Sequence, residues 1–251
     1  MKNKLGIYAY FGFDLTPSER FSLIKNAGIN DLGIWRAEDF MLMTKLGEYE
    51  QTKLIAEYGF NITYAHAPIR LTPYLANKYY NKAETLKTYK LWLKGCEELH
   101  IPILVIHTPA CTPDLIENLR ELSDFANTCN VKIAVENIEG LAPFDEIFAA
   151  IDNIYFCFDS SHAALFGDAR GEMALKYKDR LICTHLSDND LSKDRHWMIG
   201  DGNIEWKQVA SNLKKANYKG TINFEVFRSP NYSDAKSFID TLKTRAEEYF
   251  A

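Results

Sequence analysis

Residues 131–162 read VKIAVENIEGLAPFDEIFAAIDNIYFCFDSSH, and this stretch decides the fold. Two short runs rich in β-branched and aromatic residues, Lys132–Val135 and Tyr155–Phe158, predict strands. The segment Phe144–Ile151, which lies between them, has a helical period. A strand, a helix and a second strand in succession predict a βαβ unit with parallel strands.

The same alternation runs along the whole chain. Strands are predicted at Leu5–Tyr10, Asp31–Trp35, Ile62–Ala65, Ile103–Ile106, Lys132–Val135, Tyr155–Phe158, Leu181–Thr184 and Thr221–Phe224. Helices are predicted at Pro17–Ala27, Leu46–Tyr58, Lys78–Leu99, Pro113–Thr128, Phe144–Ile151, Gly171–Lys178, Trp206–Ala216 and Asp234–Tyr249. Because no Pro/Gly/Ser-rich linker interrupts the series, we expect an α/β fold, a (β/α)₈ TIM barrel that forms a single domain over residues 1–251.

Local signals support several element ends. Thr16 and Thr112 each precede a proline and resemble N-caps, and Gly28, Gly59 and Gly220 fall where a helix should stop before the next strand. An open doubly wound sheet is the alternative fold. It would need a glycine-rich phosphate turn after the first strand, and the sequence there, YFGFD, is not one.

Composition excludes several classes of protein. The 251 residues are 47% hydrophobic and 25% charged, which is typical of a globular protein. A net charge of −5 without a long Lys/Arg run gives no support for tight nucleic-acid binding. No apolar stretch approaches the roughly 18 residues of a membrane span, and the N-terminus lacks a signal-peptide pattern, so we expect a cytoplasmic protein. The five cysteines are widely spaced, so neither a disulfide framework nor a thiolate zinc site is expected.

Polar residues follow the ends of the predicted strands. A TIM barrel carries its active site at the carboxyl ends of its strands, so residues at these positions indicate function. The candidates are His66, His107, Glu136, Asp159, His162, His185, Asp194, His196 and Glu225. Five of the six histidines and four carboxylates would therefore meet at one face, and only His100 lies elsewhere.

Each candidate also has a structural explanation. A lone histidine after an apolar run is more often a hydrogen-bonded structural residue than a ligand. Asp159 could cap the following turn, and Asp194 and His196 could be solvated surface. Together, however, nine such groups would place several charges in a partly dry site, which costs several kcal/mol unless cations neutralise them. Imidazole and carboxylate ligands without thiolate suit Zn²⁺ or Mn²⁺, with Fe²⁺ a further option.

The motifs at these positions resemble those of the xylose-isomerase-like barrel superfamily, which contains sugar isomerases and epimerases, inosose-processing enzymes and endonuclease IV. The most specific motifs are CFDSSHA at 157–163 and HLSDND at 185–190, the latter followed by DRH at 194–196 and IGDGNI at 199–204. The resemblance extends from His66 to Glu225.

The resemblance implies one metal held by two Glu, one Asp and one His, which here match Glu136, Glu225, Asp159 and His185. In the epimerase branch the two glutamates also flank the substrate carbon, so that one removes a proton and the other returns it. His162 would then steady a substrate oxygen.

The endonuclease IV branch implies a cluster of three zinc ions instead, and all nine of its ligand positions have counterparts here. His66 and His107 would hold one ion, and His162, Asp194 and His196 would serve a second. Clustered metals suit phosphodiester hydrolysis, so this branch implies a phosphodiesterase whose substrate is abasic DNA. The chain departs from this branch because Ile69 stands where a tyrosine is usual.

The epimerase branch also shows departures. Its members carry an arginine shortly after the strand-seven histidine, a place that Arg195 would have to fill. Tyr8 and Trp35, at the ends of strands one and two, could stack on a sugar ring or pack at the rim. The sequence favours a metal-dependent sugar (or sugar phosphate) isomerase or epimerase with one to three divalent ions and a small polyhydroxylated substrate. An endonuclease IV-like phosphodiesterase, with nucleic acid as its partner, is the alternative, and the oligomeric state is left open.

Overall fold

The computed structural model describes residues 3–35, 48–77, 81–108, 111–138 and 142–250. Its strands are β1 Leu5–Tyr8, β2 Asp31–Trp35, β3 Asn61–His66, β4 Ile103–Thr108, β5 Lys132–Asn137, β6 Tyr155–Asp159, β7 Leu181–His185 and β8 Ile222–Phe224. Its helices are α1 Pro17–Asn26, α3 Glu48–Glu57, η1 Ile69–Leu71, α4 Thr72–Leu75, α5 Lys82–Glu98, α6 Pro113–Thr128, α7 Ala142–Ala150, α8 Ser160–Leu165, α9 Glu172–Lys176, α10 Trp206–Lys215 and α11 Ala235–Phe250. Within these ranges, no helix is both long and apolar enough to cross a bilayer.

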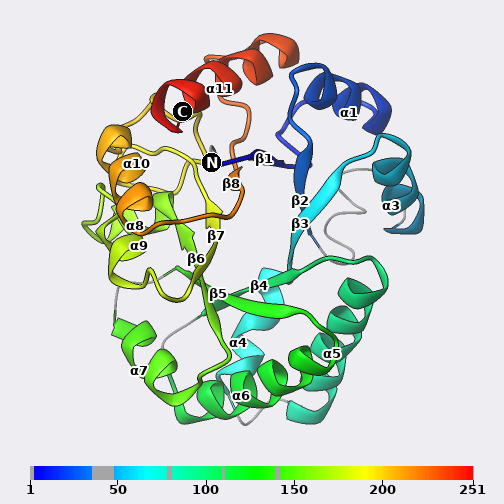
Figure 1. The fold of residues 1–251 in the computed structure, drawn as a ribbon, viewed down its shortest axis with the longest axis vertical. Helices are drawn as coiled ribbons and strands as arrows, with labels where there is room; N and C mark the ends of the chain where they lie inside the picture. Colours follow the sequence, from blue (N-terminus) through cyan, green and yellow to red (C-terminus); the bar gives the residue numbers. More distant parts are fainter. Residues whose placement is uncertain (1–2, 36–47, 78–80, 109–110, 139–141, 251) are drawn as a thin grey trace.

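The eight strands form one parallel sheet that closes into a barrel, with the helices outside it (Figure 1). The strand order β7-β6-β5-β4-β3-β2-β1-β8 leaves β7 and β8 at the two ends of the ladder. A parallel bridge between Leu186 and Phe224 joins these ends, and the Glu225 N–H donates to the Leu186 carbonyl at 3.1 Å. The predicted (β/α)₈ barrel is therefore confirmed, and the open sheet is excluded.

Helix caps agree with most of the predicted element ends. Thr16 and Glu19 form a capping box at the start of α1, and the Thr112 hydroxyl accepts from the Leu115 N–H at the start of α6. Gly28 and Gly59 have positive φ angles of 79° and 65° after α1 and α3, as predicted.

Other element ends differ from the prediction. The helix stop predicted at Gly220 was wrong, because α10 ends at Lys215 and Asn217 takes the left-handed conformation with a φ of 55°. Strand β1 ends at Tyr8 rather than Tyr10. The short helix α8 was not predicted; it begins directly after Asp159, whose side chain caps it. Leu46 and Lys78, which begin two of the predicted helices, lie outside the described residues.

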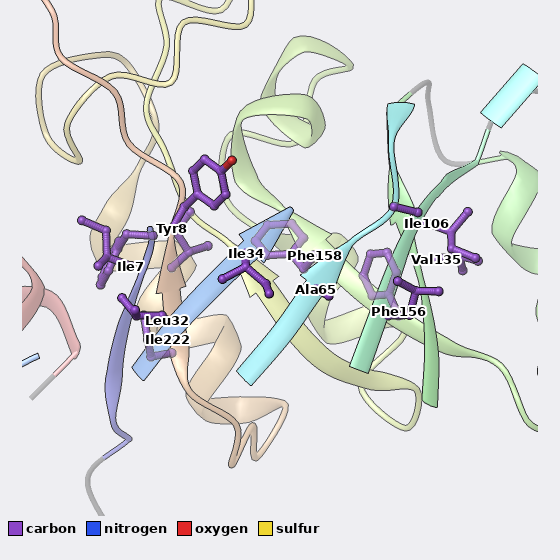
Figure 2. Packing of buried hydrophobic residues seen from close by; sticks show 14 of the residues in the cluster. Ile7, Tyr8, Leu32, Ile34, Ala65, Ile106, Val135, Phe156, Phe158 and Ile222 are labelled. Atoms are coloured by element: carbon purple, nitrogen blue, oxygen red, sulfur yellow. The ribbon is translucent and has the colours of Figure 1, made fainter. Parts of the chain in front are cut away.

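Side chains alternate between the two faces of each strand, because successive residues of a strand point to opposite sides. One set packs between the strands and the helices as the main apolar core (Figure 2). Figure 2 shows Ile34, Ala65, Ile106 and Phe158 in this set. The other set fills the barrel interior as a separate buried cluster made of Tyr64, Val105, Ala134, Cys157 and Cys183.

The alternation also places the polar residues. On β3 to β7, the residue two positions after each member of the interior cluster is a candidate ligand: His66, His107, Glu136, Asp159 and His185. Since residues i and i+2 share a face, these five side chains form the next interior layer, toward the carboxyl ends of the strands. Register places His107 beside Glu136 and Asp159 beside His185.

Candidate metal site

Glu136 lies at the centre of the polar layer. Its Oε2 atom is 3.0 Å from His66 Nε2, 3.0 Å from His185 Nδ1 and 3.5 Å from His107 Nε2. Its Oε1 atom is 3.4 Å from His162 Nδ1. One carboxylate that is only 1% exposed therefore contacts four imidazoles, and each of its oxygens has its own partners.

A second centre forms around Asp194, in the loop that follows β7. Its Oδ2 atom is 3.4 Å from His162 Nε2 and 3.0 Å from His196 Nε2. The Ser161 hydroxyl donates to Asp194 Oδ1 at 2.6 Å and holds the carboxylate in place. His162 thus joins the loop to Glu136, so the loop residues are part of the same site.

Asp159 and Glu225 complete the site. Asp159 Oδ1 lies 3.7 Å from His162 Nδ1, and Glu225 Oε2 lies 3.5 Å from His185 Nδ1. The structure therefore brings all nine predicted residues into one network of contacts. Four of them, Glu136, Asp159, His185 and Glu225, each offer a ligand atom within 4.8 Å of the others.

The histidines do not all present the same ring nitrogen to the carboxylates of the site. A ring nitrogen of His66, His162 and His196 contacts a backbone carbonyl: Nδ1 lies 2.6 Å from the Ala67 oxygen, 2.8 Å from the Asn137 oxygen and 3.0 Å from the Glu225 oxygen, respectively. A carbonyl only accepts, so Nδ1 carries the hydrogen of the neutral ring, and the Nε2 lone pair of that form is available to a metal ion. His185 is reversed, because its Nδ1 faces the carboxylates.

Among the residues that the structure describes, three buried polar atoms of the site have no hydrogen-bond partner: Glu136 Oε1, Asp159 Oδ2 and His185 Nδ1. Buried polar atoms without a partner cost free energy, so their convergence here needs a physical explanation. Asp159 does cap α8, since its Oδ1 accepts from the His162 N–H at 2.7 Å, but capping leaves Oδ2 unused. A divalent cation among these atoms would satisfy all three, so the residues present fit a metal.

The electrostatics of the site point the same way. Burial raises the pKa of Asp159 to about 7. Burial alone would lower the pKa values of His185 and His196. Glu136 and Glu225 instead raise the pKa of His185 well above its ordinary value. Asp194 likewise raises the pKa of His196 to about 9. The carboxylates therefore draw protons onto the histidines, and a divalent ion supplies the same positive charge directly.

The structure also reveals supporting residues to which the sequence analysis assigned no role. The Asn137 side chain donates to the Asp159 carbonyl and accepts from the Asp159 N–H, both at 2.8 Å, and so locks β5 to β6 beside the site. Asp188 binds the loop that carries Asp194 and His196, because its carboxylate accepts hydrogen bonds from three backbone N–H groups and one indole N–H. Asp188 is the fourth residue of the HLSDND motif, three positions after His185.

Of the three residues predicted only as substrate contacts, two can be placed. Arg195 donates to Asp190 Oδ2 at 2.8 Å and lies over the Trp197 ring. Tyr8 is fully buried, with its ring centroid 6.0 Å from that of Phe227. The side chain of Trp35 lies outside the described residues.

These features define a TIM barrel with a dense histidine and carboxylate site at the carboxyl ends of its strands. The chain belongs to the xylose isomerase-like TIM barrel family, whose model matches residues 21–245.

Relatives fall in both branches of the family. An uncharacterized protein of Methanocaldococcus jannaschii is 30% identical over an alignment 208 positions long, which covers 72% of this chain and 69% of the relative. The inosose isomerase of Halalkalibacterium halodurans is 24% identical, and the match covers 93% of each chain. A probable endonuclease 4 of Mycoplasma mycoides is 30% identical over 49% of this chain and 55% of that relative.

Solved structures share the fold. A D-tagatose 3-epimerase-like protein superposes with a TM-score of 0.78 at 22% identity, over 99% of this chain and 97% of the other. A D-allulose 3-epimerase from Methylomonas sp., in complex with D-allulose, gives a TM-score of 0.78 at 16% identity, over 100% and 98% of the two chains. At these identities the likeness establishes the fold.

His196 provides a first test of the site. Its φ of 48° is left-handed, a conformation that costs a non-glycine residue about 1 kcal/mol or more and that is often found at functional sites. Asparagine tolerates this conformation, so we expect His196→Asn to keep the fold but to weaken metal binding by about 10- to 100-fold. Metal affinity measured by equilibrium dialysis checks this result.

His100 is the matched control, because it has a φ of 56° and is the histidine outside the site. His100→Asn should change neither metal affinity nor the free energy of unfolding by a measurable amount. Equal metal affinity of the two variants would show that His196 has only a structural role.

Proposed function

We propose that the protein is a divalent-metal-dependent enzyme of the sugar isomerase or epimerase type. Its substrate would be a small polyhydroxylated molecule, with or without a phosphate group. The observation that carries this proposal is the pair of buried carboxylates Glu136 and Glu225, whose Oε2 atoms lie 3.0 and 3.5 Å from the same His185 Nδ1. Two carboxylates that converge on one point suit proton removal and proton return at one carbon.

The four residues Glu136, Asp159, His185 and Glu225 would hold the ion. Their imidazole and carboxylate atoms suit Zn²⁺ or Mn²⁺. When bound, the ion supplies a Lewis acid that polarises a carbonyl and its neighbouring hydroxyl. The five other predicted ligands allow up to two further ions.

The remaining steps fall to the protein's own residues. One of the two glutamates removes the proton from the carbon next to the carbonyl, and the other returns a proton to it. His162 contacts both Glu136 and Asp194, and we propose that it steadies a substrate oxygen. Tyr8, Trp35 and Arg195 stay predictions as substrate contacts; Arg195 would first have to leave Asp190.

The comparisons support this proposal through their coverage. The inosose isomerase matches 93% of the chain and the sugar epimerase structures match nearly all of it, whereas the endonuclease 4 match covers about half. A barrel without large insertions has room for a small substrate at its strand ends.

The test is solvent deuterium exchange. The protein is purified without chelator, its metal content is measured by elemental mass spectrometry, and ketoses and inososes, free and phosphorylated, are incubated with it in D₂O. Proton transfer at carbon should appear in the NMR spectrum as deuterium incorporated next to a carbonyl. If no substrate of the panel exchanges while an abasic-site duplex is cleaved, the proposal is wrong.

A phosphodiesterase of the endonuclease IV type is the second candidate, and one observation favours it. Glu136 contacts imidazoles through both oxygens, Oε2 with His66 and Oε1 with His162, so it would be able to help hold more than one ion. A single ion held by Glu136, Asp159, His185 and Glu225 would not need four further candidate ligands, which are His66, His107, Asp194 and His196. Two or three zinc ions per chain would favour this candidate.

Truncation of the outer histidines distinguishes the two candidates. Under the phosphodiesterase proposal, His66→Ala and His107→Ala should each remove one ion and reduce cleavage by about 100-fold or more. Under the isomerase proposal, the ion at Glu136, Asp159, His185 and Glu225 should remain bound. Elemental analysis and a cleavage assay check both variants, and undiminished cleavage with unchanged metal content would contradict the phosphodiesterase proposal.

A further inference from the structure

Two cysteines lie directly beneath the candidate metal site. Cys183 precedes His185 by two residues on β7, so the two side chains share the inner face of the strand. Cys157 is its register partner on the neighbouring strand β6. Both thiols are free and at most 1% exposed, and the wide spacing of the cysteines in the sequence gave no sign that they meet.

The thiol of Cys183 contacts Nε2 of His185, the ring nitrogen that points away from the carboxylates of the site. Cys183 Sγ lies 3.9 Å from His185 Nε2, while Nδ1 on the opposite side of the ring faces Glu136 and Glu225. Within the described part of the chain, Cys183 is the one hydrogen-bond partner recorded for Nε2. A histidine can ligate a metal through one nitrogen only if the hydrogen sits on the other, and a partner at that other nitrogen fixes the choice.

The other histidines show what is unusual here. His66, His162 and His196 each have a backbone carbonyl at Nδ1, which leaves Nε2 for the site. His185 presents the opposite nitrogen, and a side-chain sulfur stands where the other three have a carbonyl. The partner of His185 Nε2 is therefore a side chain, which can be replaced by mutation.

We propose that Cys183 is a positioning residue: its sulfur accepts a hydrogen bond from His185 Nε2–H and so directs the Nδ1 lone pair into the candidate metal site. The inference rests on the metal binding assumed in the proposed function, but not on the substrate or the reaction.

The surroundings hold the sulfur and the ring in place. The Asn223 side-chain amide donates to Cys183 Sγ at 3.9 Å, and Asn223 is itself fixed by Thr63, whose hydroxyl donates to Asn223 Oδ1 at 3.0 Å. The Tyr64 ring packs against His185 with a centroid distance of 4.5 Å and restricts its rotation. A sulfur acceptor is weaker than the carboxylate or carbonyl usual at this position, but it is enough to select which ring nitrogen carries the hydrogen.

The experiment compares Cys183→Ala and Cys183→Ser with the matched control Cys157→Ala. The two alanine variants remove the same atoms from the same buried layer, so their losses of packing should be similar. Cobalt(II) and zinc affinities are measured by equilibrium dialysis, and the His185 tautomer is assigned by ¹⁵N NMR on the zinc-loaded protein and on the metal-free protein at alkaline pH.

We expect Cys183→Ala to weaken metal binding by about 10- to 100-fold, Cys183→Ser to restore much of it, and Cys157→Ala to leave it unchanged. Wild-type protein should show the Nε2–H tautomer of His185, and Cys183→Ala a mixture. Equal losses of affinity in both alanine variants, an Nδ1–H tautomer in the wild type, or a sulfur-to-cobalt charge-transfer band would overturn the proposal. A wild-type chain that binds no divalent ion would instead overturn the proposed function, while the tautomer in the metal-free protein still decides the role of Cys183.

Discussion

Glu225→Gln should reduce turnover of an exchanging substrate by about a thousandfold, which lies within the range for loss of a positioned acid or base. Glutamine keeps the shape of the side chain but can neither take nor return a proton. Glu136, Asp159 and His185 would still offer ligand atoms, so the ion should remain bound, although less tightly. The measurement is the rate of deuterium exchange at saturating metal, together with metal content and the midpoint of unfolding.

Glu205→Gln is the control for this experiment. Glu205 is exposed and paired with Arg170 at 2.8 Å, so its replacement should leave exchange unchanged. Full activity of Glu225→Gln at normal metal content would mean that Glu225 transfers no proton, and the isomerase proposal would lose its mechanism.

Asp188→Ala should cost about 4 kcal/mol of the free energy of unfolding, because a fully buried acceptor of several hydrogen bonds would be lost. Asp188 Oδ2 accepts from the Gly200 N–H at 2.8 Å and from the Trp206 indole N–H at 2.7 Å. Asp188 Oδ1 accepts from the N–H groups of Ile204 at 3.1 Å and Asn189 at 2.9 Å. Without this carboxylate the four donors are left in a buried region without an acceptor.

The same substitution should also affect the candidate metal site. The loop that Asp188 ties together carries Asp194 and His196, so metal content should fall along with stability. Urea unfolding and elemental analysis measure the two effects.

Asp190→Ala is the control for Asp188. Asp190 lies in the same loop and also makes several hydrogen bonds, to Ser192 and Arg195, but these contacts are exposed. We therefore expect a change in the free energy of unfolding of about 1 kcal/mol or less. If both aspartates prove equally dispensable, Asp188 does not hold the loop.

Gly202, the second glycine of the GDGN segment at 200–203, shows how closely this loop is packed. A Cβ atom on Gly202 would lie 2.2 Å from the Asn189 carbonyl oxygen and 2.4 Å from Asp188 Oδ1. Only glycine fits at that point, because backbone atoms cannot move aside as a flexible side chain can. The loop sequence is thus constrained by contacts with Asp188 and Asn189.

The strand ends show how far the sequence could predict the site. Alternation along a strand has a period of two, so a buried run that ends in Glu136 or His185 necessarily directs that side chain to the same face as the residue two positions earlier. Parallel strands linked by right-handed helical connections bring all their carboxyl ends to one side. The eight strands and the gathering of the polar residues at their ends could therefore be predicted from the sequence.

The helix ends show where local prediction failed. Gly28 and Gly59 were predicted correctly, but after α10 the left-handed residue is Asn217, and Gly220 lies three residues later. The predicted helix end at Ala216 was within one residue of the observed end, but asparagine and glycine both tolerate a positive φ, so the sequence did not show which residue takes it.

By itself, the sequence determined the barrel, the order of its elements and the set of side chains at its carboxyl end. Only the tertiary structure decided which atoms meet. It showed that Glu136 contacts four imidazoles, and that His185 presents Nδ1 to the site with Cys183 at its other nitrogen. It also showed that Arg195 donates a hydrogen bond to Asp190. The physical reason is that strand periodicity is a local property of the chain, whereas these contacts depend on the register between strands and on a loop held by one buried carboxylate.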